Sequence, residues 1–194
     1  MTDHRMAIFA SGAGSNAREL IRHFHGHPRC RVALVACNRP DAGVIGVAGE
    51  AGIPVLHLER DRFFRGDGHL PELMEAGIDL IVLAGFLWKV PSALVKAFPD
   101  RILNIHPALL PAHGGKGMYG SHVHEAVIRG GDPHSGITIH LVDEQYDHGR
   151  TLFQARLDLL PEETPESLAQ RIHVLEHRHF PAVVEAFLEN QTSC

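Results

Sequence analysis

An amide, an imidazole and a carboxylate stand out in this sequence as a combination that could carry out acyl transfer. Asn104 and His106 end an apolar run that Pro107 stops, and an acidic turn with Asp147 follows about forty residues later. An amide N–H can donate to an oxygen that becomes negative in a tetrahedral intermediate. An imidazole can move the proton that an attacking amine loses, and a nearby carboxylate would orient it and favour its protonated form. We predict these three residues as the catalytic group.

Each of these residues also has a structural interpretation. Asn104 could be a buried amide that satisfies the backbone, and His106 could be a core histidine that donates to a carbonyl. Asp143 and Glu144 compete with Asp147 for the carboxylate role, although acids in a turn are commonly solvated. Residues two apart on a strand project to the same face, so Asn104 and His106 are expected to point together. The combination favours a site over unrelated structural roles.

A glycine turn at 11–16 lies between the first apolar run and the first segment of helical periodicity. Exposed N–H groups at a helix start, with the positive end of the helix dipole, can hold a phosphate. The turn has neither the lysine of a P-loop nor the three-glycine spacing of a dinucleotide site. It favours a small phosphorylated ligand. The alternative is a plain tight turn in which Ser15 or Asn16 caps the helix.

Short apolar runs alternate with segments of helical spacing along the whole chain. The predicted strands are 6–10, 31–37, 54–58, 79–84, 101–105, 136–142 and 151–159, and the predicted helices are 17–25, 42–51, 70–77, 92–98, 121–129 and 165–188. Ser121 is expected to cap its helix, and Pro181 to kink or break the last one. This alternation predicts an α/β fold with a doubly wound, mostly parallel sheet, helices on both faces and an antiparallel hairpin near the C-terminus. We expect a single domain over 1–194.

Composition excludes several classes of function. The net charge is −5, and lysine and arginine form no cluster longer than a pair, which argues against a nucleic-acid surface. The three cysteines have no metal-like spacing, and no apolar run has the length of a membrane span. The N-terminus lacks the apolar stretch of a secretory signal. We therefore predict a cytoplasmic protein with no membrane or nucleic-acid partner.

The sixteen histidines invite a metal hypothesis that their spacing does not support. Those at positions 23, 25 and 27 would point to different faces of a helix, so no metal site is predicted. Thr138 and His140 share one face of a strand and are expected to line a pocket. His124, near the start of a helix beside the glycine loop, could line the site, although a surface polar residue is the simpler interpretation.

Four motifs in order, at 9–16, 83–86, 104–111 and 147–149, resemble the folate-dependent formyltransferases, whose fold is Rossmann-like. The resemblance runs from Met6 to about Phe187. The Asn-x-His-Pro-x-Leu-Leu-Pro signature is highly specific for this superfamily, and Ser-Gly-x-Gly-Ser-Asn resembles the glycinamide branch rather than the methionyl-tRNA branch.

The resemblance implies transfer of the formyl group of 10-formyltetrahydrofolate, a co-substrate, to the amine of 5'-phosphoribosylglycinamide in purine biosynthesis. It implies no metal and leaves open a monomer or a homodimer. The alternatives are hydrolysis of formyltetrahydrofolate, formylation of another amine, and a non-catalytic binding module.

The resemblance also implies binding residues. Gly14, Ser15 and Asn16 would hold the ribose phosphate, and Glu176, with His173 one turn before it, would contact the ribose or amide end. The residues implied to bind folate are Leu87, Trp88, Lys89, Val90, Asn104, Val142, Asp143 and Glu144.

The sequence departs from the family pattern at two places, and both concern positively charged side chains expected to contact a ligand. Trp88 stands where many family members carry an arginine, so Lys89, Arg62 or Arg65 is expected to meet the glutamate side of the folate. The loop 114–120 is longer than the common version, and its Lys116 could contact a phosphate or carboxylate.

Overall fold

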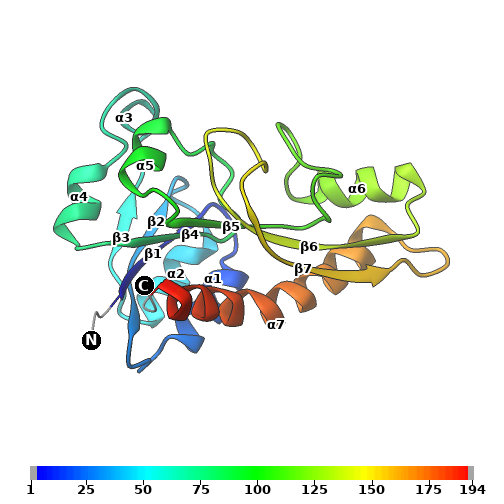
Figure 1. Ribbon diagram of the computed structural model, residues 1–194, viewed down its shortest axis with the longest axis horizontal. Coiled ribbons are helices and arrows are strands. Elements are labelled where there is room, and N and C mark those ends of the chain that lie inside the picture. Colours follow the sequence, from blue (N-terminus) through cyan, green and yellow to red (C-terminus); the bar gives the residue numbers. More distant parts are fainter. Residues whose placement is uncertain (1–3, 192–194) are drawn as a thin grey trace. The chain divides into compact units, whose positions relative to one another are not determined.

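The computed structural model describes residues 4–191, and the chain divides into two compact units (Figure 1). The first unit is Met1–Leu103 and the second is Asn104–Cys194. The prediction of one domain over the whole chain stays a prediction.

The strands of the first unit pair in parallel. They are β1 (His4–Ala10), β2 (Cys30–Cys37), β3 (Val55–His57) and β4 (Leu80–Leu83), in the order β3-β2-β1-β4. All four residues of β4 and six of the seven in β1 are buried. Parallel strands covered on both faces need such continuous apolar runs, which is why the sequence marks them clearly.

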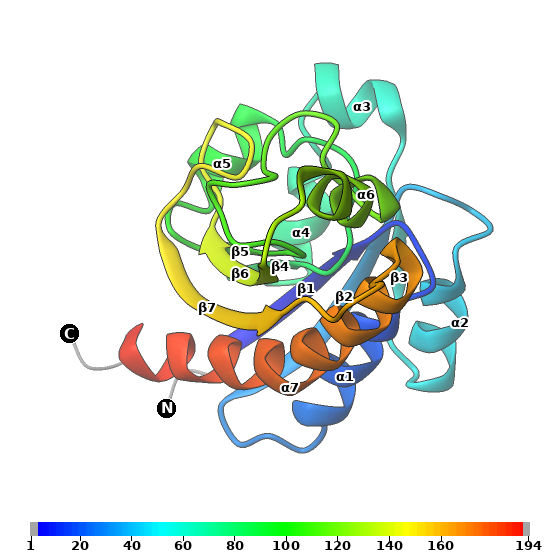
Figure 2. The ribbon, with the colours of Figure 1, turned by 90° about the vertical axis from the view of Figure 1, so that its right-hand side faces the viewer.

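Five helices cover the strands of the first unit. They are α1 (Ser15–His23), α2 (Gly43–Glu50), α3 (Arg60–Arg65), α4 (Leu70–Glu75) and α5 (Ser92–Ala97). Figure 2 shows α1 and α2 on one side of these strands and α4 and α5 on the other. The six-residue α3 was not expected from the sequence, because so short a segment carries little periodicity; its buried Phe63 anchors it.

The second unit begins within β5 (Ile102–His106) and continues with α6 (Ser121–Gly130), β6 (His134–Leu141), β7 (Thr151–Asp158) and α7 (Pro165–Gln191). β6 and β7 pair antiparallel, with His134 opposite Asp158 and a register shift between Ile139 and His140. The long C-terminal helix α7 packs against α6 and β6.

The pairings confirm the predicted class: mostly parallel strands with helices, and an antiparallel pair near the C-terminus. Two local predictions are wrong. Pro181 does not break α7 but lies buried inside the continuous helix, because packing of its neighbours outweighs the lost backbone hydrogen bond; a kink there stays a prediction. The N-cap of α6 is Gly120 rather than Ser121, and it makes no side-chain cap bond.

Each unit has its own apolar core. In the first unit Phe9 on β1, Phe63 on α3 and Leu73 on α4 are fully buried, and in the second unit Ile137 on β6 and Phe180 on α7 are fully buried. Among residues 4–191, no helix has both the length and the apolar character that a bilayer crossing requires.

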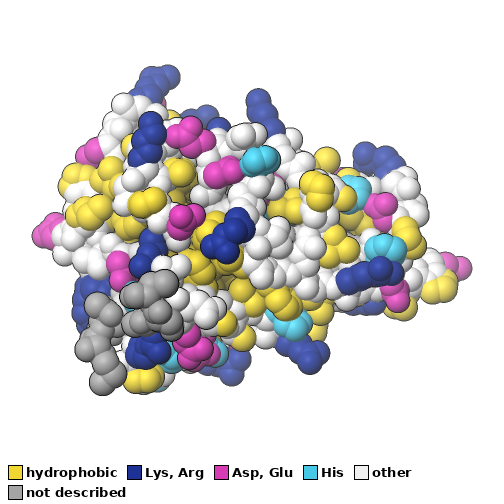
Figure 3. All heavy atoms as spheres, viewed as in Figure 1, with side chains coloured by type: hydrophobic (Ala, Val, Ile, Leu, Met, Phe, Trp, Pro, Cys, Tyr) yellow, Lys and Arg dark blue, Asp and Glu magenta, His cyan; other side chains and the backbone are white. Residues whose placement is uncertain are grey.

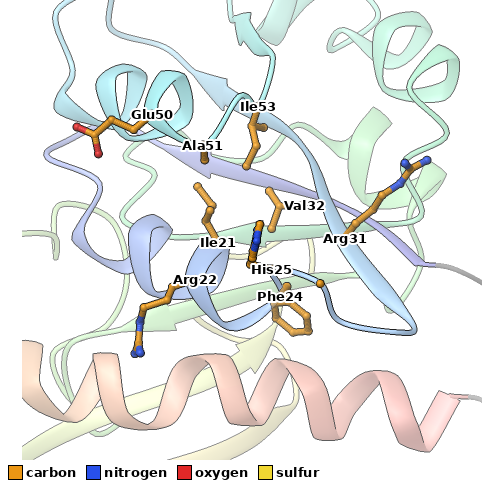
Figure 4. A pocket seen from close by; sticks show the side chains of 10 residues that line it. Ile21, Arg22, Phe24, His25, Arg31, Val32, Glu50, Ala51 and Ile53 are labelled. Atoms are coloured by element: carbon orange, nitrogen blue, oxygen red, sulfur yellow. The ribbon is translucent and has the colours of Figure 1, made fainter.

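The first unit also carries an open hollow of about 550 Å³, formed by α1, the segment after it, β2 and α2 (Figure 4). Ile21, Val32 and Ile53 point into it, while Arg22 and Glu50 turn outward at its rim. None of the residues predicted to be catalytic or to bind a substrate lines this hollow.

Candidate active site

Asn104 and His140 are hydrogen-bonded to each other in the second unit. Asn104 Nδ2 lies 3.1 Å from His140 Nε2, and His140 Nδ1 lies 2.8 Å from the Leu141 carbonyl oxygen. A carbonyl oxygen only accepts, so His140 Nδ1 carries the proton and Nε2 accepts from the Asn104 amide. An amide nitrogen has two hydrogens, so Asn104 keeps a second donor for another acceptor.

His106, on the same strand as Asn104, is buried with 3% of its surface exposed. Its Nε2 donates to the carbonyl oxygen of His113 at 2.8 Å. The proton of the neutral ring is therefore on Nε2, and the lone pair is on Nδ1. Nδ1 lies 3.7 Å from Asp147 Oδ1.

Asp147 stands between two imidazoles. Its Oδ1 is 3.7 Å from both His106 Nδ1 and His140 Nε2, and its Oδ2 accepts the Gly115 N–H at 2.8 Å. Its backbone is left-handed, with φ of 51°, in the turn between β6 and β7. Asn104, His140, Asp147 and His106 thus form one connected polar cluster.

The two competing acids of this turn are placed differently from Asp147. The Asp143 side chain is 41% exposed against 12% for Asp147, although Asp143 interacts electrostatically with His140. Asp143 accepts from the Gln145 N–H at 2.7 Å and contacts His148 Nδ1 at 2.8 Å, both in the exposed turn. Glu144 is exposed. The geometry therefore favours Asp147 as the carboxylate that acts on His106.

For both His106 and Asp147, burial and the neighbouring groups shift the pKa in opposite directions. Burial lowers the pKa of His106 below its ordinary value, although the Asp147 carboxylate and the His113 carbonyl oppose this shift. For Asp147, burial favours the neutral acid, but His140, His106 and the Gly115 N–H together hold its pKa below the usual value. The effect of the carboxylate on the pKa of His106 agrees with the prediction, whereas the larger effect of burial depends on the folded structure.

The segment after β5 is fixed by side chains of β6 and β7. Thr138 Oγ1 accepts the Leu110 N–H at 2.9 Å and donates to the Ala108 carbonyl at 2.7 Å. Gln154 Nε2 donates to both Thr138 Oγ1 and the Leu110 carbonyl at 2.9 Å. These contacts use the one hydrogen and both lone pairs of the Thr138 hydroxyl. Thr138 therefore holds this segment in place, and its predicted position in a pocket stays a prediction.

The expectation that His124 is a surface residue is wrong. It lies on α6 with 4% of its surface exposed, and burial, reinforced by His173 and His106, lowers its pKa to about 4. It adjoins the apolar stripe of α6, which contains Val123 and Val127. That helical spacing is the sequence signal that could have indicated burial.

The two residues predicted on α7 lie on that helix as expected, but in different environments. Glu176 is buried with 5% of its surface exposed, whereas His173 is exposed and its ring stacks with that of His177 at 6.3 Å. A carboxylate buried to this degree is costly unless it is paired. Their contact with a substrate stays a prediction.

The glycine turn of the first unit begins α1 as predicted. Gly14 is the N-cap, with φ of 84°, and a Cβ there would lie 2.8 Å from Val44 Cα. Only glycine accommodates both this left-handed φ and the close approach to Val44. Ser15 and Asn16 lie inside the helix, so the alternative in which one of them is the N-cap is wrong. Phosphate binding by this turn stays a prediction.

Trp88 belongs to an aromatic cluster in the first unit. Its ring centroid lies 5.5 Å from Phe63, 5.3 Å from Phe64 and 6.3 Å from Phe86. The preceding Leu87 is 42% exposed, and its N–H donates to Ser11 Oγ at 3.0 Å. Folate binding by residues 87–90 and 142–144 stays a prediction.

The cations predicted for the folate tail differ in their surroundings. Arg62 uses all three guanidinium nitrogens on Asp67 and Glu72, with Nε 3.0 Å from Asp67 Oδ1. Arg62 is therefore already paired within the protein, and its contact with a ligand stays a prediction. Arg65 is 83% exposed and lies 3.8 Å from Asp61, and Lys89 and Lys116 are exposed as well. Contact of these three with a ligand also stays a prediction.

The described residues contain no group of three or more histidine, cysteine or acidic side chains placed to hold a metal ion. On the face shown in Figure 3, lysine and arginine side chains are scattered among acidic and apolar ones rather than gathered in one patch.

This fold belongs to a known class. Residues 4–184 match the formyl transferase family, and the chain is a member of that family.

Among curated relatives, the chain is similar to phosphoribosylglycinamide formyltransferase of Arabidopsis thaliana, a chloroplastic protein, with 43% identity over 96% of this chain and 66% of the relative. It is 33% identical to the Bacillus subtilis enzyme of the same name over 95% of this chain and 94% of the relative. It spans 62% of the Vigna unguiculata relative and 14% of a trifunctional purine biosynthetic protein of Drosophila melanogaster. The chain thus covers less than two thirds of several relatives.

Solved structures agree with this grouping. Glycinamide ribonucleotide transformylase 1 of Symbiobacterium toebii has a TM-score of 0.88 at 33% identity, covering 97% of this chain and 89% of that one. Phosphoribosylglycinamide formyltransferase of Bacillus halodurans has a TM-score of 0.85 at 37% identity, covering 95% of each.

Proposed function

We propose that this protein transfers the formyl group of 10-formyltetrahydrofolate to the amine of 5'-phosphoribosylglycinamide in purine biosynthesis. Family membership and the names of the relatives support the reaction class and the substrates. The observation that carries the proposal is the cluster in which Asp147 lies 3.7 Å from both His106 and His140, and His140 contacts Asn104 at 3.1 Å. It supplies a donor, a base and a carboxylate.

The first step is attack of the amine on the formyl carbon. The carbonyl oxygen becomes negative as the new C–N bond forms, and a preorganised donor stabilises it. Asn104 takes this role with the amide hydrogen that does not go to His140. The hydrogen bond to His140 fixes the amide plane, so the donor is oriented before the substrate arrives.

The second requirement is movement of one proton. Neutral His106 accepts the proton of the attacking amine at Nδ1, and the Asp147 carboxylate at 3.7 Å stabilises the imidazolium that forms. The same proton then passes to the folate nitrogen as its bond to the formyl carbon breaks. The amine gains a formyl group, the folate nitrogen gains a hydrogen, and His106 returns to its starting state.

Binding is assigned to other residues by the family resemblance. Gly14, Ser15 and Asn16 are proposed to bind the phosphate, and Glu176 and His173 the ribose or amide end. The cytoplasmic location also stays a prediction, since two plant relatives are described as chloroplastic.

One assay tests the proposal against its alternatives. The purified chain is incubated with 10-formyltetrahydrofolate, with and without phosphoribosylglycinamide, and loss of the formyl group is followed. We expect loss that depends on the amine and yields the formylated product. Equal loss without the amine would identify a hydrolase. No loss in either case would contradict the formyl-transfer proposal.

A further inference from the structure

His113 is linked to the catalytic cluster although no sequence motif points to it. Its carbonyl oxygen accepts the Nε2 hydrogen of His106 at 2.8 Å. Two residues further on, the Gly115 N–H donates to Asp147 Oδ2 at 2.8 Å. One three-residue segment therefore makes a backbone contact with each of the two residues proposed to move the proton.

The backbone of this segment adopts a conformation that its sequence does not favour. His113 has φ of 54°, in the left-handed region that costs a non-glycine residue on the order of 1–2 kcal/mol. A Cβ at Gly114 would lie 2.5 Å from Leu110 Cδ2 and 3.3 Å from Asp147 Cβ. The segment thus passes tightly beside Asp147. A stabilising contact has to compensate for the unfavourable left-handed conformation of His113.

The side chain of His113 provides such a contact. Its Nε2 lies 2.5 Å from Oδ2 of Asp132, which follows the C-cap of α6. A hydrogen bond to a carboxylate is stronger than one between neutral groups. The His113 ring is 22% exposed and the Asp132 side chain 38% exposed, so neither belongs to the buried core.

We propose that His113 and Asp132 are a positioning pair that holds His106 in its Nε2–H tautomer, with Nδ1 directed to Asp147 for proton transfer. The inference rests on the proposed function only for the role of Nδ1 in the reaction. The side chains of the pair contact each other, and only the His113 carbonyl contacts His106. The pair acts by fixing the carbonyl that accepts from His106, since the hydrogen bond at one imidazole nitrogen decides which nitrogen keeps the lone pair.

Two variants remove the contact in different ways. His113→Asn keeps a residue that tolerates left-handed backbone but is too short to reach Asp132 as the imidazole does. Asp132→Ala removes the carboxylate and leaves His113 intact. Asp132→Asn preserves the shape and one acceptor oxygen and is the conservative rescue. Asp158→Ala, which removes an exposed carboxylate on β7, is the matched control.

The first readout is the tautomer of His106, measured by long-range ¹H–¹⁵N NMR and assigned by comparison with His106→Gln. We expect the Nε2–H form in the wild type, Asp132→Asn and Asp158→Ala proteins, and a mixture of tautomers in His113→Asn and Asp132→Ala. An unchanged tautomer in both of these variants overturns the proposal, even if turnover falls, because the effect would then arise by another route.

The second readout is turnover of formyl transfer. We expect kcat to fall by on the order of 10- to 100-fold in His113→Asn and Asp132→Ala, with KM for both substrates near the wild-type value. A shifted tautomer with full kcat would leave the positioning role standing and remove His106 from the chemistry. That result would overturn the proposed mechanism instead, so the two failures are distinguishable.

Discussion

Nδ1 of His106 lies 3.7 Å from Oδ1 of Asp147, while Nε2 of the same ring donates to a backbone carbonyl at 2.8 Å. The distance to Asp147 is longer than a hydrogen bond but short enough for a strong charge interaction or a bridging water. The two nitrogens of His106 therefore have different tasks: Nε2 fixes the ring, and Nδ1 remains available for the proton.

Replacing His106 by alanine tests the chemistry directly. We expect kcat to fall by on the order of 10²- to 10⁴-fold with nearly normal folate binding, because a general acid and base is lost but binding contacts remain. Steady-state kinetics and a folate binding titration provide the measurement. His57→Ala, an exposed histidine at the end of β3, is the control. Full turnover in His106→Ala would remove this residue from the mechanism.

Replacing Asp147 by asparagine tests the electrostatics of the pair. The carboxylate raises the pKa of His106 against the larger, opposite effect of burial. Without it, burial acts unopposed by that charge, so we expect the titration midpoint of His106 to fall further below its ordinary value. An NMR pH titration of the His106 ring in both proteins measures this. A midpoint that rises in Asp147→Asn would contradict the arrangement described above.

Replacing Gly14 by valine tests the glycine turn. A Cβ at this position would lie 2.8 Å from Val44 Cα, and φ is 84°, so the turn must distort. We expect a higher KM for the phosphorylated substrate, together with a lower melting temperature. Gly46→Ala is the control, because a Cβ at that helical position meets nothing within 4 Å. If the KM of Gly14→Val equals that of the wild type, this turn does not bind the phosphate.

The buried His124 makes stability depend on pH. Its pKa is about 4 in the folded protein and 6.5 in the unfolded chain, so the unfolded chain takes up a proton first as pH falls. The contribution of His124 to the free energy of unfolding should therefore be greatest above pH 6.5. It should decrease by roughly 3 kcal/mol as pH falls to about 4. Denaturant unfolding at several pH values measures this decrease.

His124→Gln should lose that part of the pH dependence, because glutamine does not titrate. His122→Gln, which changes an exposed histidine two residues earlier on α6, should retain it. Identical pH profiles for wild type and His124→Gln would show that another group causes the decrease.

Local sequence patterns predict most of the helices and strands. Buried parallel strands such as β4 appear as continuous apolar runs, so the sequence marks them within a residue or two. The short α3 and the uninterrupted α7 were not foreseen. In both, the contacts of a few buried side chains, Phe63 in one and Phe180 and Pro181 in the other, outweigh weak or unfavourable local propensity.

The sequence by itself determined that Asn104 and His106 share a strand and its face, because strand geometry alternates with a period of two. Only the tertiary structure decided that Asp147 faces His106, that Thr138 holds a backbone segment, and that His113 fixes the tautomer of His106. These contacts join residues that are 7 to 41 positions apart through turns and loops. Burial likewise depends on the whole packed unit, so the lowered pKa of His106 and of His124 could not be read from their neighbours in the sequence.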